Sequence, residues 1–350
     1  GSAGTTRPFT HIVDRDGSVQ YLVYITDGDL KVFNLEGVAQ TVTFQQYDGS
    51  GNEVSSGGTS CASYFDIANT SEPAQSFRLA SVADFTFITN REQKIEMATA
   101  TSPTFSQSTG LVFIRQGEYN TTYSVTLNAS DHAETKKEFT TPIIGSGAST
   151  SAPSNTSVAN GLRDLINNDS TLGSEYTATT VGDYLLKIVK DDGGDFTIAV
   201  SDTIADMFIV GIKDKIEALQ QLPLKGINGQ ILKIMGSSST ELDDYFVKFE
   251  TSDGGTEGKG IWRETVEPGI IYKFKPEKMP HVLIRNDDGT FTVKRHTWRE
   301  RVAGSALTAP EPPFVGEVIK NINVFRNRLV FLSDEYVCLS AADDYARFWP

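Results

Sequence analysis

The sequence predicts a mainly β protein with one α+β module, in which antiparallel β-meanders resemble blades of an incomplete β-propeller. A strand-turn-strand pattern recurs at residues 29–34, 84–89 and 328–333, and each copy follows a tight turn. Aromatic residues are frequent, with 20 Phe and 12 Tyr against 4 Met and 3 Trp, which is typical of β proteins. Only one segment shows a clear helical spacing of apolar residues.

In each copy an apolar residue is followed by a residue of any type, then by two apolar residues and a polar one. Because strand side chains alternate between faces and short turns return the chain antiparallel, each copy predicts a β-meander. A propeller blade exposes apolar faces that neighbouring blades cover, and three copies do not close a ring. We therefore expect a fragment of a longer polypeptide.

Both ends of the sequence fit this expectation. The first four residues, Gly1 to Gly4, resemble the remnant of an engineered fusion. At the other end, we expect Phe348 and Trp349 to have nothing to pack on.

The first predicted domain covers residues 1–109 and consists of meanders. Asp27 and Gly28 lie between two alternating runs, which is a strong hairpin signal. A Gly/Ser-rich loop at 49–60 separates the first meander from a second one at 77–97. The strands expected in the first meander are 21–25, 30–35 and 42–47.

The second predicted domain, 110–222, is the α+β module. A helix near 157–168 is expected because Val158, Leu162 and Ile166 recur at helical spacing behind the capping candidates Asn155 and Ser157. A low-complexity stretch at 145–157 precedes it, and 213–222 fits a helix or a strand. The expected strands are 111–114 and 123–127, read as one hairpin, and then 176–180, 184–189 and 196–200.

The third predicted domain, 223–350, is β-rich and ends in the third meander. A Pro-rich segment at 307–314 is expected to be an extended tie, because proline cannot donate to a strand ladder. Asp287 to Gly289 should turn a hairpin. The strands expected before the tie are 231–234, 245–249, 261–263, 272–274, 282–284 and 291–293.

Charge and composition exclude some classes of protein. The chain has 31 Lys and Arg against 45 Asp and Glu, a net charge of −14, which argues against a surface that holds phosphates by counterion release. No apolar run is long enough for a membrane helix. The two cysteines, Cys61 and Cys338, are expected to be reduced thiols.

No catalytic, cofactor or metal site is expected. Nucleophile elbows, P-loops, dinucleotide-binding glycine motifs and zinc-protease helices are absent from the sequence. No histidine has metal-ligand neighbours at the right spacing, and His281 is expected to be a half-buried structural residue. The acidic loop 191–195 fits a cation site or a solvated turn, and the turn is favoured. Paired acids of a glycosidase leave no sequence pattern, so that alternative stays open.

The final segment combines arginines with aromatic residues. Arg326 and Arg328, with Phe325 nearby, fit either stacking on nucleic acid or a strand core. The structural interpretation is favoured because the aromatic residues alternate as strand core positions do. The arginines are then expected to pair with the acids Asp334, Glu335, Asp343 and Asp344.

A set of segments resembles, in the same order, the tail nozzle (tail tubular protein B) family of short-tailed bacteriophages. The segments are YLVYI (21–25), LKVFN (30–34), VADFTFITNR (82–91), LVFIRQGEY (111–119), DYFVKF (244–249), WRET (262–265), MPHVLIR (279–285), PFVG (313–316) and FRNRLVFLS (325–333). The family-motif residues that we take from this resemblance, all with a structural role, are Asp84, Asn90, Arg91, Met279, Pro280, His281, Phe325, Arg326, Asn327 and Arg328.

The resemblance implies a virion structural protein that is not an enzyme. It would form a hexameric ring beneath the tail adaptor, build the distal DNA-ejection channel and help to dock tail fibres. Phage DNA would pass through without specific binding. The protein would be made in the host cytoplasm and located in the virion tail. The alternatives are a glycan-binding or polysaccharide-degrading tail protein and a host-surface binding module. The host, the lumen-facing residues, the channel gate and the oligomeric state of this chain alone stay open.

Overall fold

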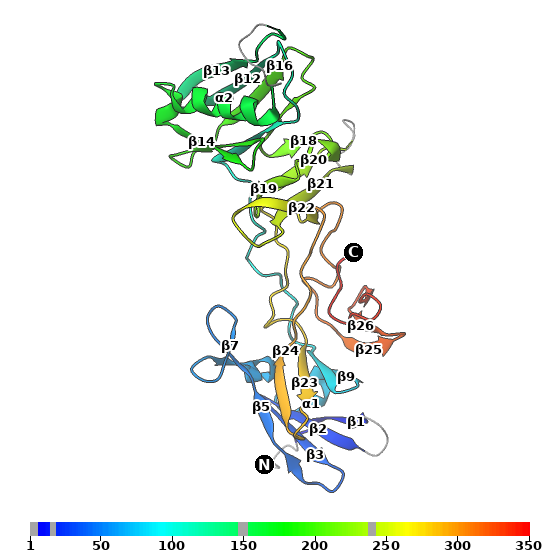
Figure 1. Cartoon of the computed structure of the whole chain (residues 1–350). Helices are drawn as coiled ribbons and strands as arrows, with labels where there is room; N and C mark the ends of the chain where they lie inside the picture. Colours follow the sequence, from blue (N-terminus) through cyan, green and yellow to red (C-terminus); the bar gives the residue numbers. More distant parts are fainter. Residues whose placement is uncertain (1–5, 15–18, 146–152, 237–242) are drawn as a thin grey trace. The chain divides into compact units, whose positions relative to one another are not determined.

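The computed structural model describes residues 6–14, 19–145, 153–236 and 243–350. These residues form two compact units. Unit 1 comprises Gly1–Thr101, Ile271–Arg301 and Ala309–Pro350, and unit 2 comprises Ser102–Ile270 and Val302–Thr308 (Figure 1). The first four residues and most of the low-complexity stretch lie outside the described residues.

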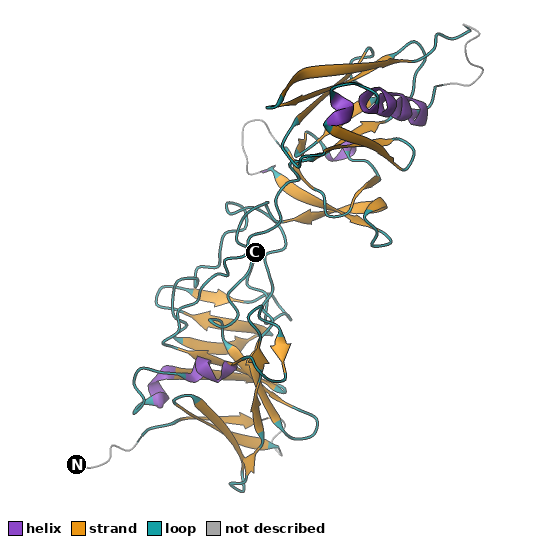
Figure 2. Cartoon of the chain, turned by 90° about the vertical axis from the view of Figure 1, so that its left-hand side faces the viewer, coloured by secondary structure: helices purple, strands orange, loops and turns teal. Residues whose placement is uncertain are grey.

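Strands account for most of the regular structure in both units (Figure 2). The prediction of a mainly β fold with many antiparallel pairs is therefore confirmed. The three aligned segments lie on β3, β10 and β26, and each is the second strand of a tight hairpin. In the described part of the chain, neither helix is long and apolar enough to cross a membrane.

The first sheet of unit 1 is a four-stranded antiparallel meander. Its strands are β1 (Phe9–Asp14), β2 (Gln20–Thr26), β3 (Asp29–Asn34) and β4 (Ala39–Gln40). Gly28 turns β2 into β3 with a φ of 67°, a conformation that costs glycine little. One face of the sheet carries the buried side chains of Val23, Ile25, Leu30 and Val32.

The second sheet of unit 1 joins segments from the two ends of the sequence. Its order is β5-β24-β23-β10-β9, and only the β5–β24 pair is parallel. The strands are β5 (Val42–Phe44), β9 (Phe77–Val82), β10 (Phe85–Asn90), β23 (His281–Arg285) and β24 (Phe291–Arg295). The hairpin predicted at Asp287 to Gly289 is present, and it completes this sheet.

Two predicted meanders are therefore corrected. Residues 42–44 pair with β24 instead of continuing the first meander, and the second meander has only two local strands. An alternating pattern specifies which face of a strand is buried, but it does not specify which strand lies beside it.

Short elements surround these sheets. The predicted Gly/Ser loop contributes to a small three-stranded sheet of β6 (Gln46–Tyr47), β7 (Glu53–Val54) and β8 (Thr59–Ser60). The 3-10 helix η1 (Cys61–Phe65) follows, and the Ser60 hydroxyl caps it by accepting from the Ala62 amide at 3.2 Å. The short helix α1 (Pro73–Ser76) precedes β9. Both cysteines are free, and Cys61 is buried.

The terminal meander is present as predicted. It comprises β25 (Asn321–Phe325), β26 (Arg328–Leu332) and β27 (Val337–Leu339), all antiparallel. Its inner face packs Leu329 and Phe331 into an aromatic core that also includes Phe314.

The expectation that Phe348 and Trp349 have nothing to pack on is wrong. The two side chains are only 9% and 6% exposed. The ring of Phe348 stacks on Phe331 with a centroid distance of 4.4 Å, and Trp349 stacks on Phe274 at 5.2 Å. Phe348 and Trp349 meet these partners only in the folded chain, and the local sequence pattern does not predict the contacts.

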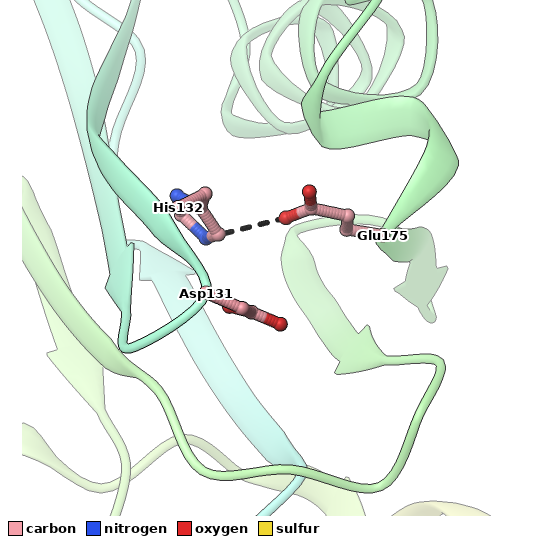
Figure 3. Close-up of side chains that lie close together, drawn as sticks. All are labelled: Asp131, His132 and Glu175. Carbon is pink, nitrogen blue, oxygen red and sulfur yellow. Dashed lines mark ion pairs between the residues drawn. The ribbon is translucent and has the colours of Figure 1, made fainter.

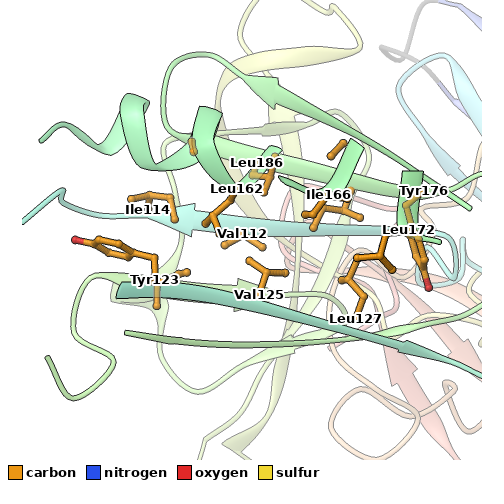
Figure 4. Close-up of a cluster of buried hydrophobic side chains, with 14 of the residues drawn as sticks. Val112, Ile114, Tyr123, Val125, Leu127, Leu162, Ile166, Leu172, Tyr176 and Leu186 are labelled. Carbon is orange, nitrogen blue, oxygen red and sulfur yellow. The ribbon is translucent and has the colours of Figure 1, made fainter. Parts of the chain in front are cut away.

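Two of the sheets of unit 2 share a core with a helix. The four-stranded sheet has the order β14-β15-β11-β17, and the three-stranded sheet has the order β13-β12-β16. Side chains of both sheets and of α2 meet in one cluster, in which Val112, Val125 and Leu162 are fully buried (Figure 4). The elements are β11 (Thr109–Ile114), β12 (Thr122–Ala129), β13 (His132–Thr140), α2 (Asn155–Asn167), η2 (Leu172–Ser174), β14 (Tyr176–Val181), β15 (Leu185–Lys190), β16 (Thr197–Asp202) and β17 (Ile209–Ile212).

The hairpin predicted between 111–114 and 123–127 is wrong. β11 pairs with β15 and β17, whereas β12 pairs with β13 and β16. The intervening turn is tied to the start of β12, because the Tyr123 hydroxyl donates to the Gln116 carbonyl at 2.9 Å and accepts from the Glu118 amide at 2.9 Å. The chain therefore crosses between sheets where the pattern indicated a return.

The predicted helix is present and begins two residues earlier than expected. Ser154 is the N-cap: its hydroxyl accepts from the Ser157 amide, and the Ser157 hydroxyl contacts the Ser154 amide, both at 3.0 Å. This reciprocal capping satisfies amides that have no partner inside the helix. The apolar positions Val158, Leu162 and Ile166 are buried as expected.

Gly161 on α2 leads to a testable prediction. A Cβ at this position would lie 2.3 Å from the ring of Phe139 on β13. In an exposed helix, Gly→Ala stabilises by up to about 1 kcal/mol. Here we expect Gly161→Ala to lower the free energy of unfolding of unit 2 by about 1–2 kcal/mol, because the ring has to move. Urea denaturation measures it.

A double variant controls this prediction. In a Phe139→Ala background the obstacle is gone, so the same Gly161→Ala change should be neutral or stabilising. Equal destabilisation in both backgrounds would contradict the steric explanation.

A five-stranded sheet completes unit 2, with the order β18-β20-β21-β22-β19. The undecided segment 213–222 contains a short strand and a 3-10 helix. Residues 272–274, predicted as a strand, lie in a connecting segment that makes only an isolated bridge. The elements are β18 (Lys215–Ile216), η3 (Leu219–Gln221), β19 (Lys225–Ile227), β20 (Ile231–Ile234), β21 (Tyr245–Thr251) and β22 (Glu257–Thr265).

Candidate functional site

Asn90, at the end of β10, is a buried structural tie. Its side-chain amide donates to the carbonyls of Tyr64 at 2.8 Å and Asp66 at 3.3 Å. Its side-chain oxygen accepts from the Glu92 amide at 2.9 Å. Asn90 is 1% exposed, so these bonds satisfy a polar group that water does not reach. Its contacts hold the segment around η1 against the second sheet.

His281, at the start of β23, is fully buried instead of half-buried as predicted. Its ring stacks on Tyr64 with a centroid distance of 3.9 Å and an interplanar angle of 12°. Its Nδ1 donates to the Met279 carbonyl at 3.0 Å, since a carbonyl only accepts. Burial lowers the pKa of His281 to about 3, so the ring is neutral near pH 7. Met279 and Pro280 beside it are also buried.

Asp84 and Arg91 lie at opposite ends of β10. The Asp84 carbonyl accepts from the Arg285 amide at 3.1 Å. The guanidinium of Arg91 donates to the Gln75 carbonyl at 2.8 Å. One sheet of unit 1 therefore brings together the motif residues Asp84, Asn90, Arg91 and 279–281. The contacts described for them hold neighbouring segments of this unit together.

The remaining motif residues form the β25–β26 hairpin. Arg326 and Asn327 have φ values of 47° and 56°, a left-handed pair that suits a tight hairpin turn. Asn327 donates from its side chain to Asp343 at 2.9 Å, and Arg328 donates to the Ser340 carbonyl at 2.8 Å. Phe325 is 56% exposed. The guanidinium of Arg326 lies over the Phe325 ring, 5.2 Å from its centroid.

The ion pairs expected for these arginines are not those that form. Within the described residues, Asp334 pairs with Lys320 at 3.4 Å and Asp344 with Arg299 at 3.1 Å. Arg326 and Arg328 form no ion pair with the described acids. Instead, Arg328 donates to the Ser340 carbonyl and Arg326 lies over the Phe325 ring.

A cluster of titratable side chains lies in unit 2, where Asp131, His132 and Glu175 come together (Figure 3). His132 Nε2 lies 3.6 Å from a Glu175 oxygen and 2.6 Å from the Tyr176 hydroxyl. Its Nδ1 donates to the Ala133 carbonyl at 2.7 Å. One ligand atom from each of the three residues fits within 4.8 Å of the others, so these residues fit the chemistry of a divalent metal.

Lys190 already provides the positive charge at this cluster. Its ammonium group lies 2.5 Å from Asp131 and 2.8 Å from Asp192, and its side chain is only 3% exposed. These hydrogen bonds raise the pKa of Lys190 and lower the pKa of Asp131 and of Asp192. Burial raises the pKa of Tyr176 to about 12. Lys190 is therefore the shared counter-charge of Asp131 and Asp192, whereas Glu175 faces His132.

The acidic loop 191–195 is explained by the same kind of contact. Asp192 also accepts from the Gly194 amide at 2.7 Å, and Asp195 pairs with Lys213 at 2.7 Å. Two of its carboxylates are thus held by lysines, which supports the turn interpretation over a cation loop.

We expect Lys190→Ala to lower the thermal midpoint of unit 2, because it leaves Asp131 and Asp192 without their shared counter-charge. Lys136→Ala is the matched control: Lys136 is 52% exposed and pairs with Glu138 on the surface, so its loss should leave the midpoint nearly unchanged. Differential scanning calorimetry distinguishes them. Equal midpoints for both variants would contradict the role given to Lys190.

Two contacts of these sites were missed from the sequence. Tyr64, which anchors both Asn90 and His281, lies in a 3-10 helix without an alternating pattern. Lys190 is remote in sequence from Asp131. The only indication of its role in the sequence was Asp192, two residues away, with which it pairs.

Comparison with known proteins identifies the family of this chain. The family model described as bacteriophage nozzle protein matches residues 1–350. The chain belongs to the bacteriophage nozzle protein family. It is also similar to tail tubular protein gp12 of Escherichia phage T7, with 29% identity over 347 residues, which is 98% of this chain and 40% of that protein. The chain thus spans well under half the length of this relative. As a nozzle-family protein it is a structural protein of the phage tail.

Proposed function

We propose that this chain is part of a subunit of a hexameric ring that builds the distal DNA-ejection channel of a phage tail. In this proposal the ring contacts the tail adaptor and helps to dock tail fibres, and the subunit is made in the host cytoplasm. The observation that carries the proposal is the family match over residues 1–350. The order of the motif segments along nearly the whole chain supports it.

The described side chains favour an assembly role over catalysis. The buried histidine with the strongest pKa shift is neutral and hydrogen-bonded, and Asp131, Asp192 and Asp195 of unit 2 pair with lysines. We propose that the ten motif residues serve the fold. We also propose that the meanders β1–β4 and β25–β27 act as blade-like units.

The acidic surface suggests how DNA passes through the channel. With a net charge of −14, like-charge repulsion acts on the phosphates within a Debye length of about 8 Å at physiological salt. We expect little binding of duplex DNA by the purified chain even at low salt, measured by fluorescence anisotropy. Tight binding that is independent of sequence would contradict this part of the proposal.

Electron cryo-microscopy of phage particles tests the ring itself. The expected result is a six-fold ring in the tail whose density accepts unit 1 and unit 2 as separate bodies. Density for the chain outside the tail, or without six-fold symmetry, would overturn the proposal. Fibre docking is tested in the same particles by whether fibre density contacts this ring.

A further inference from the structure

The outward face of the first sheet carries an apolar row. The cross-strand register places Ile12 beside Leu22, Leu22 beside Phe33 and Phe33 beside Ala39. The opposite face already packs in the core through Val23 and Val32, so this row points away from it. Ile12 is 60% exposed, and Leu22 and Phe33 are half-buried.

The turn between β3 and β4 extends this surface. Leu35 and Val38 are 65% and 57% exposed, and Glu36 lies between them. Glu36 is exposed and makes no ion pair with the described residues. We call the surface formed by Ile12, Leu22, Phe33, Leu35, Glu36 and Val38 the first face.

The outward face of the terminal meander also carries exposed apolar side chains, and its charged residue is basic where that of the first face is acidic. Phe325, Val337 and Leu339 lie on the side of the sheet away from Leu329 and Phe331, and they are 56%, 65% and 44% exposed. Arg326 is exposed beside them, with the Phe325 ring as its described contact. We call the surface formed by Phe325, Arg326, Val337 and Leu339 the second face.

We propose that the first face of one copy docks on the second face of the next copy. Exposed apolar patches of this kind mark interaction surfaces. The unpaired Glu36 and Arg326 give the two faces complementary charge, whereas each face would repel its own kind. Two different patches on one chain generate a head-to-tail contact, which forms a ring when the rotation between copies closes, whereas a two-fold contact needs only one patch. This inference rests on the proposed ring and names the surfaces that build it.

A charge swap tests the pairing. Sedimentation of the 350-residue chain over a range of concentrations should show concentration-dependent self-association. Glu36→Arg or Arg326→Glu alone should weaken it by about fivefold or more, because an attraction becomes a repulsion. The double variant should regain most of the loss. A chain that stays monomeric throughout, or a double variant no better than the singles, would overturn the inference.

A complementation experiment tests the head-to-tail arrangement. Leu35→Glu/Val38→Glu removes the first face, and Val337→Glu/Leu339→Glu removes the second. Each variant alone should be monomeric, and an equimolar mixture should form dimers and nothing larger, because one intact pair of faces remains. Self-association by either variant alone would show a two-fold contact and overturn the inference.

Leu224→Glu provides the matched control. Leu224 is 77% exposed and lies on unit 2, outside both faces, so the added charge should leave association unchanged. Thermal melts of all variants confirm that they fold. Six-fold rings in particles together with charge-swap variants that associate normally would refute these faces and leave the proposed function standing.

Discussion

Phe331→Ala is expected to lower the free energy of unfolding of unit 1 by about 4 kcal/mol, within the range for truncating a buried aromatic residue. The side chain of Phe331 is fully buried. Its ring contacts those of Phe348, Phe314 and Trp298, with centroid distances of 4.4, 5.3 and 5.7 Å. Removing it leaves a cavity that three large aromatic residues cannot fill without moving. Urea denaturation followed by tryptophan fluorescence measures the loss.

Phe325→Ala is the matched control, because Phe325 lies on the neighbouring strand of the same sheet and is 56% exposed. Its truncation should change the free energy of unfolding by no more than about 0.5 kcal/mol. Similar losses for the two variants would show that the aromatic core is not the main source of stability here.

A shift from about pH 7 to about pH 5 is expected to lower the free energy of unfolding of unit 1 by about 2 kcal/mol through His281 alone. Its pKa is lowered from 6.5 to about 3 by burial, so the unfolded chain binds a proton that the folded protein excludes. The stability is fully present above the unfolded pKa and is lost as pH falls from 6.5 towards 3. His296, whose burial lowers its pKa to about 4, acts in the same direction.

His281→Phe provides the comparison for this prediction. A phenyl ring can keep the stacking on Tyr64, which has an interplanar angle of 12°, but it cannot take up a proton. The variant loses the bond to the Met279 carbonyl and should be less stable at neutral pH. Its further loss on acidification should be smaller than that of the parent protein. Equal losses would show that His281 does not titrate with unfolding.

Features with a local physical cause were predictable. The β2–β3 hairpin was predicted because Gly28 accepts a positive φ, and the Arg326–Asn327 turn closes the predicted β25–β26 hairpin. The helix was predicted from its apolar spacing and its polar N-terminus, both of which act within a few residues. In each case the residues that cause the structure are neighbours in sequence.

Features with a long-range cause were missed. β1 carries an inward-facing His11 that weakens its pattern, and only the contact of its Nε2 with the Ser81 hydroxyl at 2.9 Å satisfies it. The pairing of β10 with β23 joins segments that are remote in sequence. The sequence of β10 does not indicate that β23 is its neighbour, and the sequence of β23 does not indicate β10.

The candidate sites show the same division. The motif residues were selected by resemblance, but burial decided their roles: His281 is enclosed completely, whereas Phe325 and Arg326 stay at the surface. The expected pairing of Arg326 with nearby acids failed because adjacent turns need not face each other. The cluster at Asp131 and His132 became visible only when β15 brought Lys190 to it.

By itself, the sequence determined the mainly β class, the hairpin turns, the capped helix and the membership of the nozzle family. Alternation, left-handed turn positions and helix caps are local properties, so they can be read in order along the chain. The tertiary structure alone decided which strands are neighbours, how Phe348 and Trp349 are covered and which apolar faces stay open. These depend on packing between distant segments, whose energy comes from buried contacts and not from any single local pattern.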